Sequence, residues 1–336
     1  MMNISMFGLF NSHEEKHTQD VIGDVVFKRF EGNPILKPNT EFPWKAKAVY
    51  NPAAIYLDNK IHLIYRGQAH DGVSCLGYAT SRDGLTIEED LEAPIYRPSA
   101  SFELPTKQGW NSGCEDPRIT QVDDRLIITY TAYDGTNPPR IAMTSISTTD
   151  FLEKRWIFEA PRLISPPGVD DKDCCIVENG SGYTAYHRLG NSLWMDSLRD
   201  LDFPEVKFLT GGILATPRSD HWDNLKIGLA APPLEIDEGL LLFYHALCNP
   251  GFKYQIGVML LDKSNPHKII ARSNAPLLSP TEYYETHGQV TNIVFSCGAI
   301  LINDTIYMYY GGADTVTGVA TIPLQGLLAS LLQQTS

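Results

Sequence analysis

The sequence predicts an all-β fold, a five-bladed β-propeller that ends in a short C-terminal helix. Three observations support this prediction. The chain of 336 residues is rich in Tyr (16) and Phe (13), and its 26 Gly and 22 Pro supply many turns, a composition typical of β structure. A pattern of an apolar stretch, a polar turn and a second apolar or aromatic stretch recurs five times. A shorter motif bounded by prolines recurs alongside it.

The copies of the longer pattern have the spacing of propeller blades. Their polar turns lie 55 to 66 residues apart, which is enough for one four-stranded blade with a long connection. In chain order the copies are NPAAIYLDNKIHLIYRG (51–67), EDPRITQVDDRLIITYTAY (115–133), KDCCIVENGSGYTAYHR (172–188), APPLEIDEGLLLFYHA (231–246) and SCGAILINDTIYMYYGGAD (296–314), with turns near Asp58, Asp123, Glu178, Asp237 and Asn303.

The shorter motif gives the same count of five. Its copies are NPILKP (33–38), APIYRP (93–98), APRLISP (160–166), the weaker ILATP (213–217) and APLLSP (275–280). Segments between the copies, such as LGYATSRDG (76–84), RIAMTSIST (140–148) and QIGVMLLD (255–262), are predicted outer strands. A pair of β-sandwiches would not explain the regular spacing, and a β-helix needs much shorter repeats.

The ends of the chain complete the predicted organisation. In IPLQGLLASLLQQ (322–334) apolar residues recur at helical spacing, which predicts the C-terminal helix. We expect residues 25–336 to form the single propeller domain and residues 1–24 to be an N-terminal extension. The N-terminal sequence lacks the basic start and the long apolar run of a secretory signal, and no stretch approaches the length of a membrane span, so we expect a cytoplasmic protein.

Charge and cysteine usage narrow the partners. Forty acidic against 27 basic residues give a net charge of -13, so nucleic acid and anionic membranes are poor general partners. The six cysteines show no CxxC spacing, and we expect neither a metal site nor a disulfide framework. The oligomeric state stays open, a homo-oligomer included.

The loops at one end of a propeller channel form a funnel in which polar side chains from different blades meet. The predicted inner hairpins carry unusual polar residues where they start and end. These are Asn51, Arg66, Glu115, Asp116, Arg118, Lys172, Asp173, His187, Arg188, His245 and Asp314.

The segment GCEDPRI (113–119) is the source of the predicted acid. Taken alone, Asp-Pro is a common dipeptide at the start of a strand, and a plain turn explains it. In the repeat context, strand alternation should send Glu115 and Asp116 to different sides and leave one carboxylate in a partly dehydrated pocket. Burial would raise the pKa of that carboxylate enough for it to act as an acid. We expect Asp116 to be this acid, because it stands where the strand begins.

Four basic or titratable side chains come from different predicted blades: Lys172, Arg188, Lys226 and His245. Each taken singly could be a surface charge with a buried stem. Apolar and aromatic neighbours of Arg188 and Lys226 indicate partial burial, and buried positive charges in an acidic protein need anions. A carboxylate could serve, but phosphate matches Arg forks and Lys point charges especially well.

Several of these motifs together resemble glycoside hydrolase family 130, the β-mannoside phosphorylases and their hydrolytic relatives. The similarity runs from about residue 30 to residue 322. It rests on EDPR (115–118), the Lys-Asp pair at 172–173, HR (187–188), WDNLKIG (222–228) followed by PP (232–233), YHA (244–246), and FSCGAI (295–300) through YYGGADTVTGVAT (309–321). The family is a five-bladed propeller, in agreement with the repeats.

The resemblance also implies roles for individual residues. Asp116 would be the general acid, which in that family is thought to act through a substrate hydroxyl. Phosphate would contact Arg188, Lys226 and His245, with Lys172 beside them. The substrate-binding residues would be Asn51, Arg66 and Asp314, which hold the mannosyl hydroxyls, together with Glu115.

The implied activity is that of an inverting phosphorylase. It would cleave β-linked mannosides with inorganic phosphate as co-substrate, give α-D-mannose 1-phosphate and need no other cofactor. An inverting β-mannosidase of the same fold, or a non-catalytic glycan-binding propeller, are the alternatives. Where many members read F-P-E-K, this chain has Cys174 to Asn179, which leaves the linkage and the acceptor sugar open.

Overall fold

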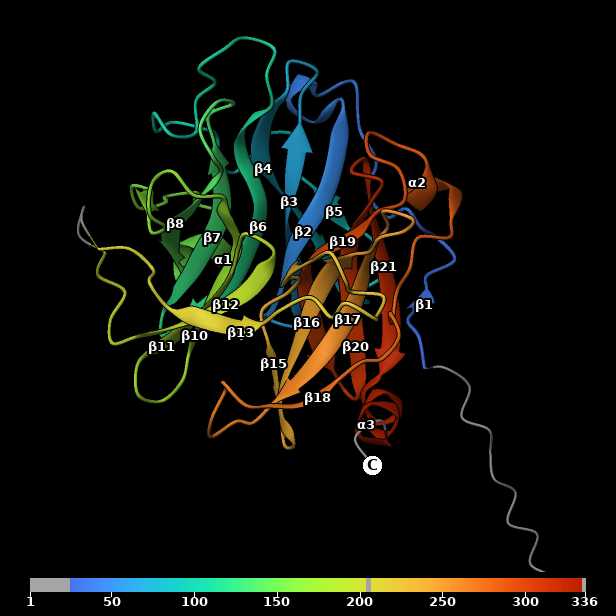
Figure 1. Cartoon of the computed structure of the whole chain (residues 1–336). Coiled ribbons are helices and arrows are strands. Elements are labelled where there is room, and N and C mark those ends of the chain that lie inside the picture. The colour runs from blue at the N-terminus through green and yellow to red at the C-terminus, as the bar shows by residue number, and fades with distance from the viewer. Residues whose placement is uncertain (1–24, 204–206, 334–336) are drawn as a thin grey trace, which may run out of the picture.

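The structure is a computed structural model that describes residues 25–203 and 207–333. These residues form a mostly β fold with a short C-terminal helix (Figure 1). The predicted N-terminal extension, residues 1–24, lies outside the described residues.

The strands form five successive antiparallel runs. The first comprises β2 (Ala48–Leu57), β3 (Lys60–Gln68), β4 (Val73–Ser81) and β5 (Glu89–Asp90), and the second β6 (Ser112–Val122), β7 (Arg125–Tyr133), β8 (Arg140–Ser147) and β9 (Arg162–Leu163). The third comprises β10 (Asp171–Glu178), β11 (Tyr183–Leu189), β12 (Ser192–Leu198) and β13 (Gly212–Ala215). The fourth comprises β14 (Lys226–Leu229), β15 (Leu234–Ile236), β16 (Gly239–Leu247), β17 (Tyr254–Leu261) and β18 (Ile269–Arg272). The fifth comprises β19 (Val294–Ile302), β20 (Thr305–Gly312), β21 (Val316–Pro323) and the N-terminal strand β1 (Lys28–Arg29).

Pairing between distant segments links the runs. A short parallel pairing of β4 with β6 joins the first two runs into one sheet. Strand β1 pairs with β21, so the first described strand of the chain completes the last sheet. The helical segments are short: η1 (Pro43–Lys45), α1 (Thr148–Leu152), α2 (Tyr283–Thr286) and α3 (Leu324–Gln333), the last of which is the predicted C-terminal helix.

All five predicted turns join the strands of a hairpin as expected. Asp58, Asp123 and Asn303 have positive φ angles of 46°, 51° and 55°, which two-residue hairpin turns require, and Asp237 lies between β15 and β16. The turn predicted near Glu178 begins directly after that residue. Glu178 is the last residue of β10, and the turn occupies residues 179–182, where two glycines supply the positive φ angles.

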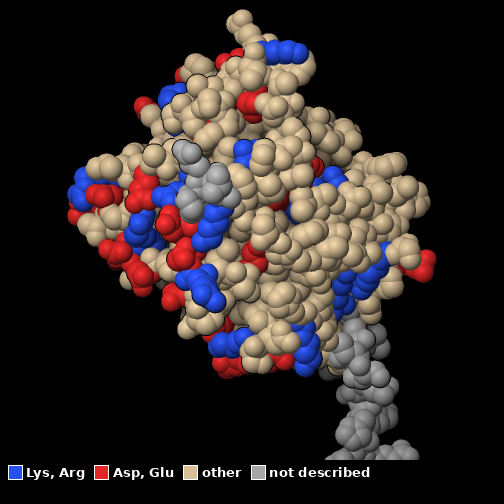
Figure 2. All heavy atoms as spheres, turned by 60° about the vertical axis from the view of Figure 1, so that its left-hand side comes forward, with Lys and Arg blue, Asp and Glu red and all other residues tan. Residues whose placement is uncertain are grey.

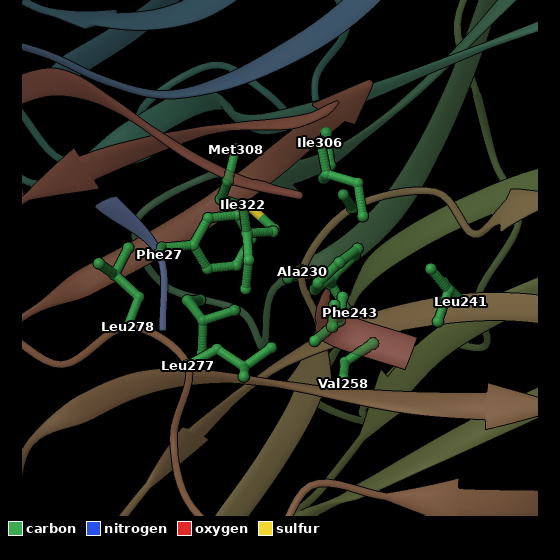
Figure 3. Close-up of a cluster of buried hydrophobic side chains, with 14 of the residues drawn as sticks. Phe27, Ala230, Leu241, Phe243, Val258, Leu277, Leu278, Ile306, Met308 and Ile322 are labelled. Atoms are coloured by element: carbon green, nitrogen blue, oxygen red, sulfur yellow. The ribbon is translucent and has the colours of Figure 1, made fainter. Parts of the chain in front are cut away.

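The apolar core lies between the faces of neighbouring runs. Figure 3 shows one cluster in which Phe27 packs with Phe243 and Val258 of the fourth run and with Met308 and Ile322 of the fifth. Helix α3 contributes its apolar face to the same cluster with Leu327, Leu328 and Leu331. The cluster therefore fastens both ends of the described chain to the last two runs.

A cavity of about 500 Å³ is lined by all five runs. It lies at the end of the inner strands where β2, β6 and β10 finish. Its walls include Ile55, Thr120, Val177, Leu234 and Ile300, one from each run. On the face shown in Figure 2, acidic and basic side chains are intermixed. Among the described residues, no helix combines the length and the apolar character that crossing a membrane requires.

Candidate active site

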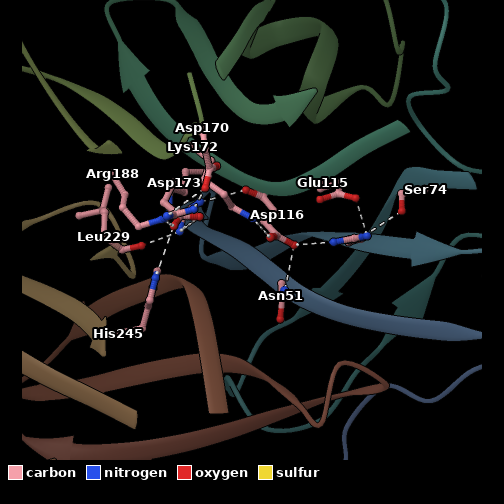
Figure 4. A network of polar contacts seen from close by, with 12 residues as sticks. Asn51, Ser74, Glu115, Asp116, Asp170, Lys172, Asp173, Arg188, Leu229 and His245 are labelled. Carbon is pink, nitrogen blue, oxygen red and sulfur yellow. Dashed lines mark hydrogen bonds and ion pairs between the residues drawn. The ribbon is translucent and has the colours of Figure 1, made fainter. Parts of the chain in front are cut away.

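Four inner strands shift register near their starts; β19 does so between Ser296 and Gly298, and in the other three the shift contains a polar residue. The ladder shifts register between Tyr50 and Ala53 in β2, between Glu115 and Arg118 in β6, and between Lys172 and Cys175 in β10. Within these bulges Asn51, Asp116 and Asp173 adopt φ angles of 51°, 50° and 56°. Asn and Asp tolerate this left-handed conformation better than other side chains, and a bulge re-aims the residue it contains. The bulges thus turn three polar side chains from three runs toward one another (Figure 4).

Asp116 lies at the centre of the resulting network. It is 3% exposed. Asn51 Nδ2 donates to its Oδ1 at 2.8 Å, Arg66 Nη1 lies 3.3 Å from the same oxygen, and Lys172 Nζ lies 3.6 Å from Oδ2. Burial acts to raise the pKa of Asp116, but Arg66, Lys172 and Asn51 together lower it below its ordinary value. The expectation that burial alone would raise this pKa is therefore wrong for the ligand-free protein.

Glu115 binds the same guanidinium as Asp116. Arg66 Nη2 donates to Glu115 Oε1 at 2.7 Å, while Arg66 Nε donates to Ser74 Oγ at 2.9 Å. The prediction that strand alternation separates the two acids is wrong, because the bulge at Asp116 breaks the alternation. Burial raises the pKa of Glu115, and the nearby Arg66 and Lys172 offset that effect only in part.

Asp314 stands in the turn between β20 and β21, with a φ of 51°. Burial and the negative charge of Asp116 raise its pKa to about 6, against the opposing influence of Arg66 and Lys172. Within residues 25–203 and 207–333 its carboxylate has no hydrogen-bond partner. We call the set Asn51, Arg66, Glu115, Asp116 and Asp314 the carboxylate half of the site.

A second cluster forms around Asp173, which is 1% exposed. Its Oδ2 accepts a hydrogen bond from Arg188 Nε at 3.0 Å and lies 3.4 Å from His245 Nε2. Its Oδ1 lies 3.6 Å from Arg118 Nη2. Burial acts to raise the pKa of Asp173, but Lys172, His245 and Arg118 lower it well below its ordinary value. We call the set Lys172, Asp173, Arg188, Lys226 and His245 the cationic half.

Arg118 is a support for the site rather than a free cation. It is fully buried and donates to three backbone carbonyls, those of Ala230, Leu229 and Asp116, at 2.9, 2.6 and 3.0 Å. The first two carbonyls lie at the end of β14 and just beyond it, where the inner strand of the fourth run is interrupted. Arg118 thereby fastens the bulge of β6 to that interruption.

The remaining members of the cationic half keep unused capacity. Lys226 is half-buried and forms no ion pair within the described part of the chain; burial together with the nearby Arg188 and Lys172 lowers its pKa. His245 is buried against Phe295, with ring centroids 4.3 Å apart, and burial lowers its pKa. Its Nδ1 is buried and has no hydrogen-bond partner. Arg188 also lies 3.5 Å from Asp170, so Lys226 is the one cation of this half that pairs with no carboxylate among the described residues.

The structure brings together the polar residues that the sequence analysis selected, except for one. It also adds one residue that the sequence analysis did not select. His187 lies apart from the shared network, because its ring nitrogens contact Asp171 at 2.6 Å and Asp196 at 3.0 Å. Tyr254 is this additional residue. Its ring lies 5.9 Å from that of His245, and the charges of Lys172, Arg188, Asp173 and Asp314 all act on its hydroxyl. Its place at the start of a strand was the only signal in the sequence.

No group of three His, Cys, Asp or Glu residues in the described ranges is arranged to hold a metal ion. Trp222 stacks on Tyr244, with ring centroids 5.6 Å apart, and packs against an apolar core cluster, whereas Trp110 is 48% exposed.

The fold is shared with a protein of known structure. The structure resembles that of a β-1,2-mannobiose phosphorylase from Listeria innocua, solved with β-1,2-mannobiose, with a TM-score of 0.75 at 23% identity; the match covers 91% of this chain and 99% of the other. The fold is thus shared with a carbohydrate-active β protein.

Sequence comparison then identifies the family. The profile of glycoside hydrolase family 130, described as β-1,4-mannooligosaccharide phosphorylase, matches residues 16–333, and the chain belongs to this family. Two relatives come from Thermoanaerobacter sp. strain X514. One is a β-1,2-mannobiose phosphorylase, 36% identical over 88% of this chain and 96% of the relative. The other is a 1,2-β-oligomannan phosphorylase, 33% identical over 90% of this chain and 99% of the relative.

Proposed function

We propose that the protein is an inverting phosphorylase that cleaves β-linked mannosides with inorganic phosphate and releases α-D-mannose 1-phosphate. The observation that carries this proposal is that the buried carboxylate of Asp116 lies next to a cluster of cations, of which Lys226 pairs with no carboxylate among the described residues. Lys172 Nζ, 3.6 Å from Asp116 Oδ2, is the point at which the two halves meet. The relatives named above are mannoside phosphorylases, which supports the same substrate and reaction.

The two halves would divide the chemistry. Asn51, Arg66, Glu115 and Asp314 offer hydrogen-bond acceptors and donors to the hydroxyls of the mannosyl unit. The cationic half would hold phosphate on the opposite face of the anomeric carbon. An inverting hydrolase needs a carboxylate base to activate water, whereas phosphate is already a nucleophile and needs only positioning and an acid opposite it.

The reaction balances with one acid. A phosphate oxygen forms a bond to the anomeric carbon as the bond to the leaving oxygen breaks, and the leaving oxygen takes a proton from Asp116, directly or through a substrate hydroxyl. The proton carried by the phosphate then restores Asp116. Inversion follows from attack on the face opposite the leaving group.

The low pKa of Asp116 in the ligand-free protein is compatible with this role. Arg66 and Lys172 stabilise its charged form. A phosphate dianion that takes up the charge of Lys172 would weaken this stabilisation, and the pKa of Asp116 would rise when both substrates are bound. Asp116 would then be protonated, and able to act as the acid, only when both substrates are bound.

We also propose the finer features of the fold. Residues 25–336 would form one five-bladed propeller after an extension of residues 1–24, with the five antiparallel runs as blades and the β1–β21 pairing as the closure of the ring. The cavity lined by all five runs and the contact of β19 with β2 support this arrangement. The cytoplasmic location stays a prediction from the sequence.

Phosphate dependence tests the function. The protein is incubated with β-1,2- and β-1,4-mannobiose, with and without phosphate, and the products are separated by chromatography. We expect cleavage that scales with phosphate and gives mannose 1-phosphate. Equal release of free mannose in phosphate-free buffer would identify a mannosidase instead, and binding without cleavage in either buffer would identify a glycan-binding module.

A further inference from the structure

An exposed aromatic pair lies on α2 and the loop that follows it. Tyr283 is 76% exposed, yet its ring is stacked on His287 with centroids 4.3 Å apart and planes at 11°. One face of the tyrosine ring is thus covered by the imidazole and the other is open to solvent. Large apolar groups that stay exposed in a fixed orientation are typical of binding surfaces.

The pair lies beside Asp314, in the carboxylate half of the site. Gln289 Nε2 donates to the backbone oxygen of Asp314 at 2.7 Å, and the Gln289 amide donates to Thr315 Oγ1 at 3.0 Å. Gly288 lies so close to Ala313 that a Cβ atom there would overlap the carbonyl oxygen of Ala313. The loop that carries His287 is therefore fixed directly on the turn that carries Asp314.

The base of α2 is rigid, which gives the pair a defined position. Glu285 is fully buried and accepts hydrogen bonds from the backbone amides of Thr281 and Glu282, from the Tyr310 hydroxyl at 2.8 Å and from Arg29 at 2.7 Å. Figure 1 shows α2 at the upper right-hand side of the molecule. A surface that is already ordered loses less entropy when a ligand binds.

The exposed apolar surface continues beyond the pair. Val290 is 47% exposed and its amide donates to the oxygen of Ala313 at 3.3 Å. Phe252 is 63% exposed on the loop between β16 and β17, and this loop meets the one after α2 where the Tyr254 amide donates to Asn292 O at 3.1 Å. We call Tyr283, His287, Val290 and Phe252 the aromatic rim.

We propose that the aromatic rim is an additional sugar-binding subsite, which holds the mannosyl units of the acceptor chain beyond the one at the scissile bond. The proposal rests on the proposed phosphorylase function and adds a preference for substrates longer than a disaccharide. A pyranose ring has an apolar face of C–H groups that packs on an aromatic ring and releases water from both. The four rim side chains themselves are uncharged, apart from the titratable His287, although the exposed Glu282 and Lys253 are their neighbours in the chain.

Kinetics with two substrate lengths test the proposal. The ratio of kcat/KM for β-mannotriose to that for β-mannobiose of the same linkage is measured for the wild type, Tyr283→Ala, Tyr283→Phe and His287→Ala. We expect the ratio to fall roughly three- to tenfold in both alanine variants and to be kept in Tyr283→Phe, which retains the ring. Tyr56→Ala, which removes a tyrosine 42% exposed at the opposite end of β2, is the matched control and should change nothing.

An unchanged ratio in both alanine variants, or an equal loss with both substrates, would overturn the subsite. A binding experiment separates this result from a failure of the proposed function. Calorimetric titration with β-mannotriose in phosphate-free buffer should show a roughly three- to tenfold weaker Kd for Tyr283→Ala, with folding checked by circular dichroism. If that loss is seen but phosphate drives no cleavage, the rim stands and the phosphorylase proposal fails. If phosphorolysis proceeds and Kd is unchanged, the rim fails alone.

Discussion

In the carboxylate half Glu115 and Asp116 share the Arg66 guanidinium, and the Asp314 carboxylate has no hydrogen-bond partner among the described residues. In the cationic half, by contrast, Arg188 and a neutral His245 contact the fully buried Asp173, and Lys226 forms no ion pair within the described part of the chain. This difference affects the pKa values of the unpaired groups in each half. The pKa of Asp314 is raised to about 6, chiefly by burial and by Asp116, while the pKa of Lys226 is lowered by burial and by neighbouring cations. The carboxylate half thus has an acid without a cationic partner, and the cationic half has a cation without an acidic partner.

This difference teaches how one site can bind two unlike substrates. Unpaired carboxylate oxygens accept hydrogen bonds from sugar hydroxyls, and unpaired cations bind an anion. The contact between Lys172 and Asp116 joins the halves, so a change in one is transmitted to the other. Substitutions in each half should therefore affect different kinetic constants, and those at Asp116 should affect turnover.

We expect the largest loss of activity from a substitution at Asp116, where the two halves meet. Asp116→Asn keeps the size of the side chain but removes the transferable proton, so kcat should fall at least about a hundredfold while the fold is kept. Single-turnover phosphorolysis of mannobiose measures the change, and circular dichroism checks the fold. Glu115→Gln is the matched control, with a smaller expected loss. Near-normal turnover of Asp116→Asn together with an inactive Glu115→Gln would move the acid to Glu115.

Removal of a single cation should separate the halves. Lys226→Ala deletes a charge that pairs with no carboxylate among the described residues, so its effect should be confined to phosphate, with a KM for phosphate ten- to hundredfold higher. The KM for mannoside should stay close to that of the wild type. Lys263→Ala, on the exposed ion pair with Glu235, serves as the control. If Lys226→Ala leaves the phosphate dependence as it was, the pocket has only a structural role.

Arg188→Ala should weaken phosphate binding similarly but should also destabilise the fold. Its Nε is a partner of the buried Asp173, which would keep a charge with fewer partners, and such a loss costs roughly 3 kcal/mol. Thermal unfolding should therefore distinguish Arg188→Ala from Lys226→Ala. Equal melting temperatures for the two variants would contradict the pairing with Asp173.

Much of the fold could be predicted because each hairpin is marked by a pattern of residues that are close together in the sequence. Polar turn residues such as Asp58 and Asn303 stand between apolar stretches, and the structure confirms hairpins there. The turn that follows Glu178 differs from the others in length, and the cause is local as well. In that copy the turn is longer and is formed by Gly180 and Gly182, so an acidic residue was a poor marker of its centre.

The site was predicted as a set of residues but not as a geometry. A strand read with period two separates Glu115 from Asp116, while the bulge at Asp116 brings both to Arg66. Register shifts depend on how β6 pairs with β7, which no local pattern states. The organising contacts of Asp173, and the approach of Tyr254, likewise arise from pairings between runs far apart in the chain.

The smallest effect concerns the pH dependence of mannoside binding. With a pKa of about 6, Asp314 is ionised at pH 7 and mostly protonated at pH 5, and only the ionised form can accept hydrogen bonds from sugar hydroxyls through both oxygens. The affinity for mannobiose should therefore fall as the pH is lowered through 6, by up to about tenfold between pH 7 and pH 5. The titration is done by calorimetry without phosphate, because phosphate itself changes charge in this range.

The charges that shift the pKa of Asp314 determine which variants serve as controls for this pH dependence. Burial and Asp116 raise its pKa, Arg66 and Lys172 lower it, and Glu115 raises it further; the lowered pKa of Asp116 keeps that acid ionised across the range. Asp314→Asn should bind mannobiose more weakly at pH 7 and show a flat profile, whereas Glu115→Gln should keep the slope but shift it to lower pH. A slope that survives in Asp314→Asn and disappears in Glu115→Gln would assign the titration to Glu115, and the carboxylate half would then bind sugar through the residue that shares Arg66 rather than through the turn.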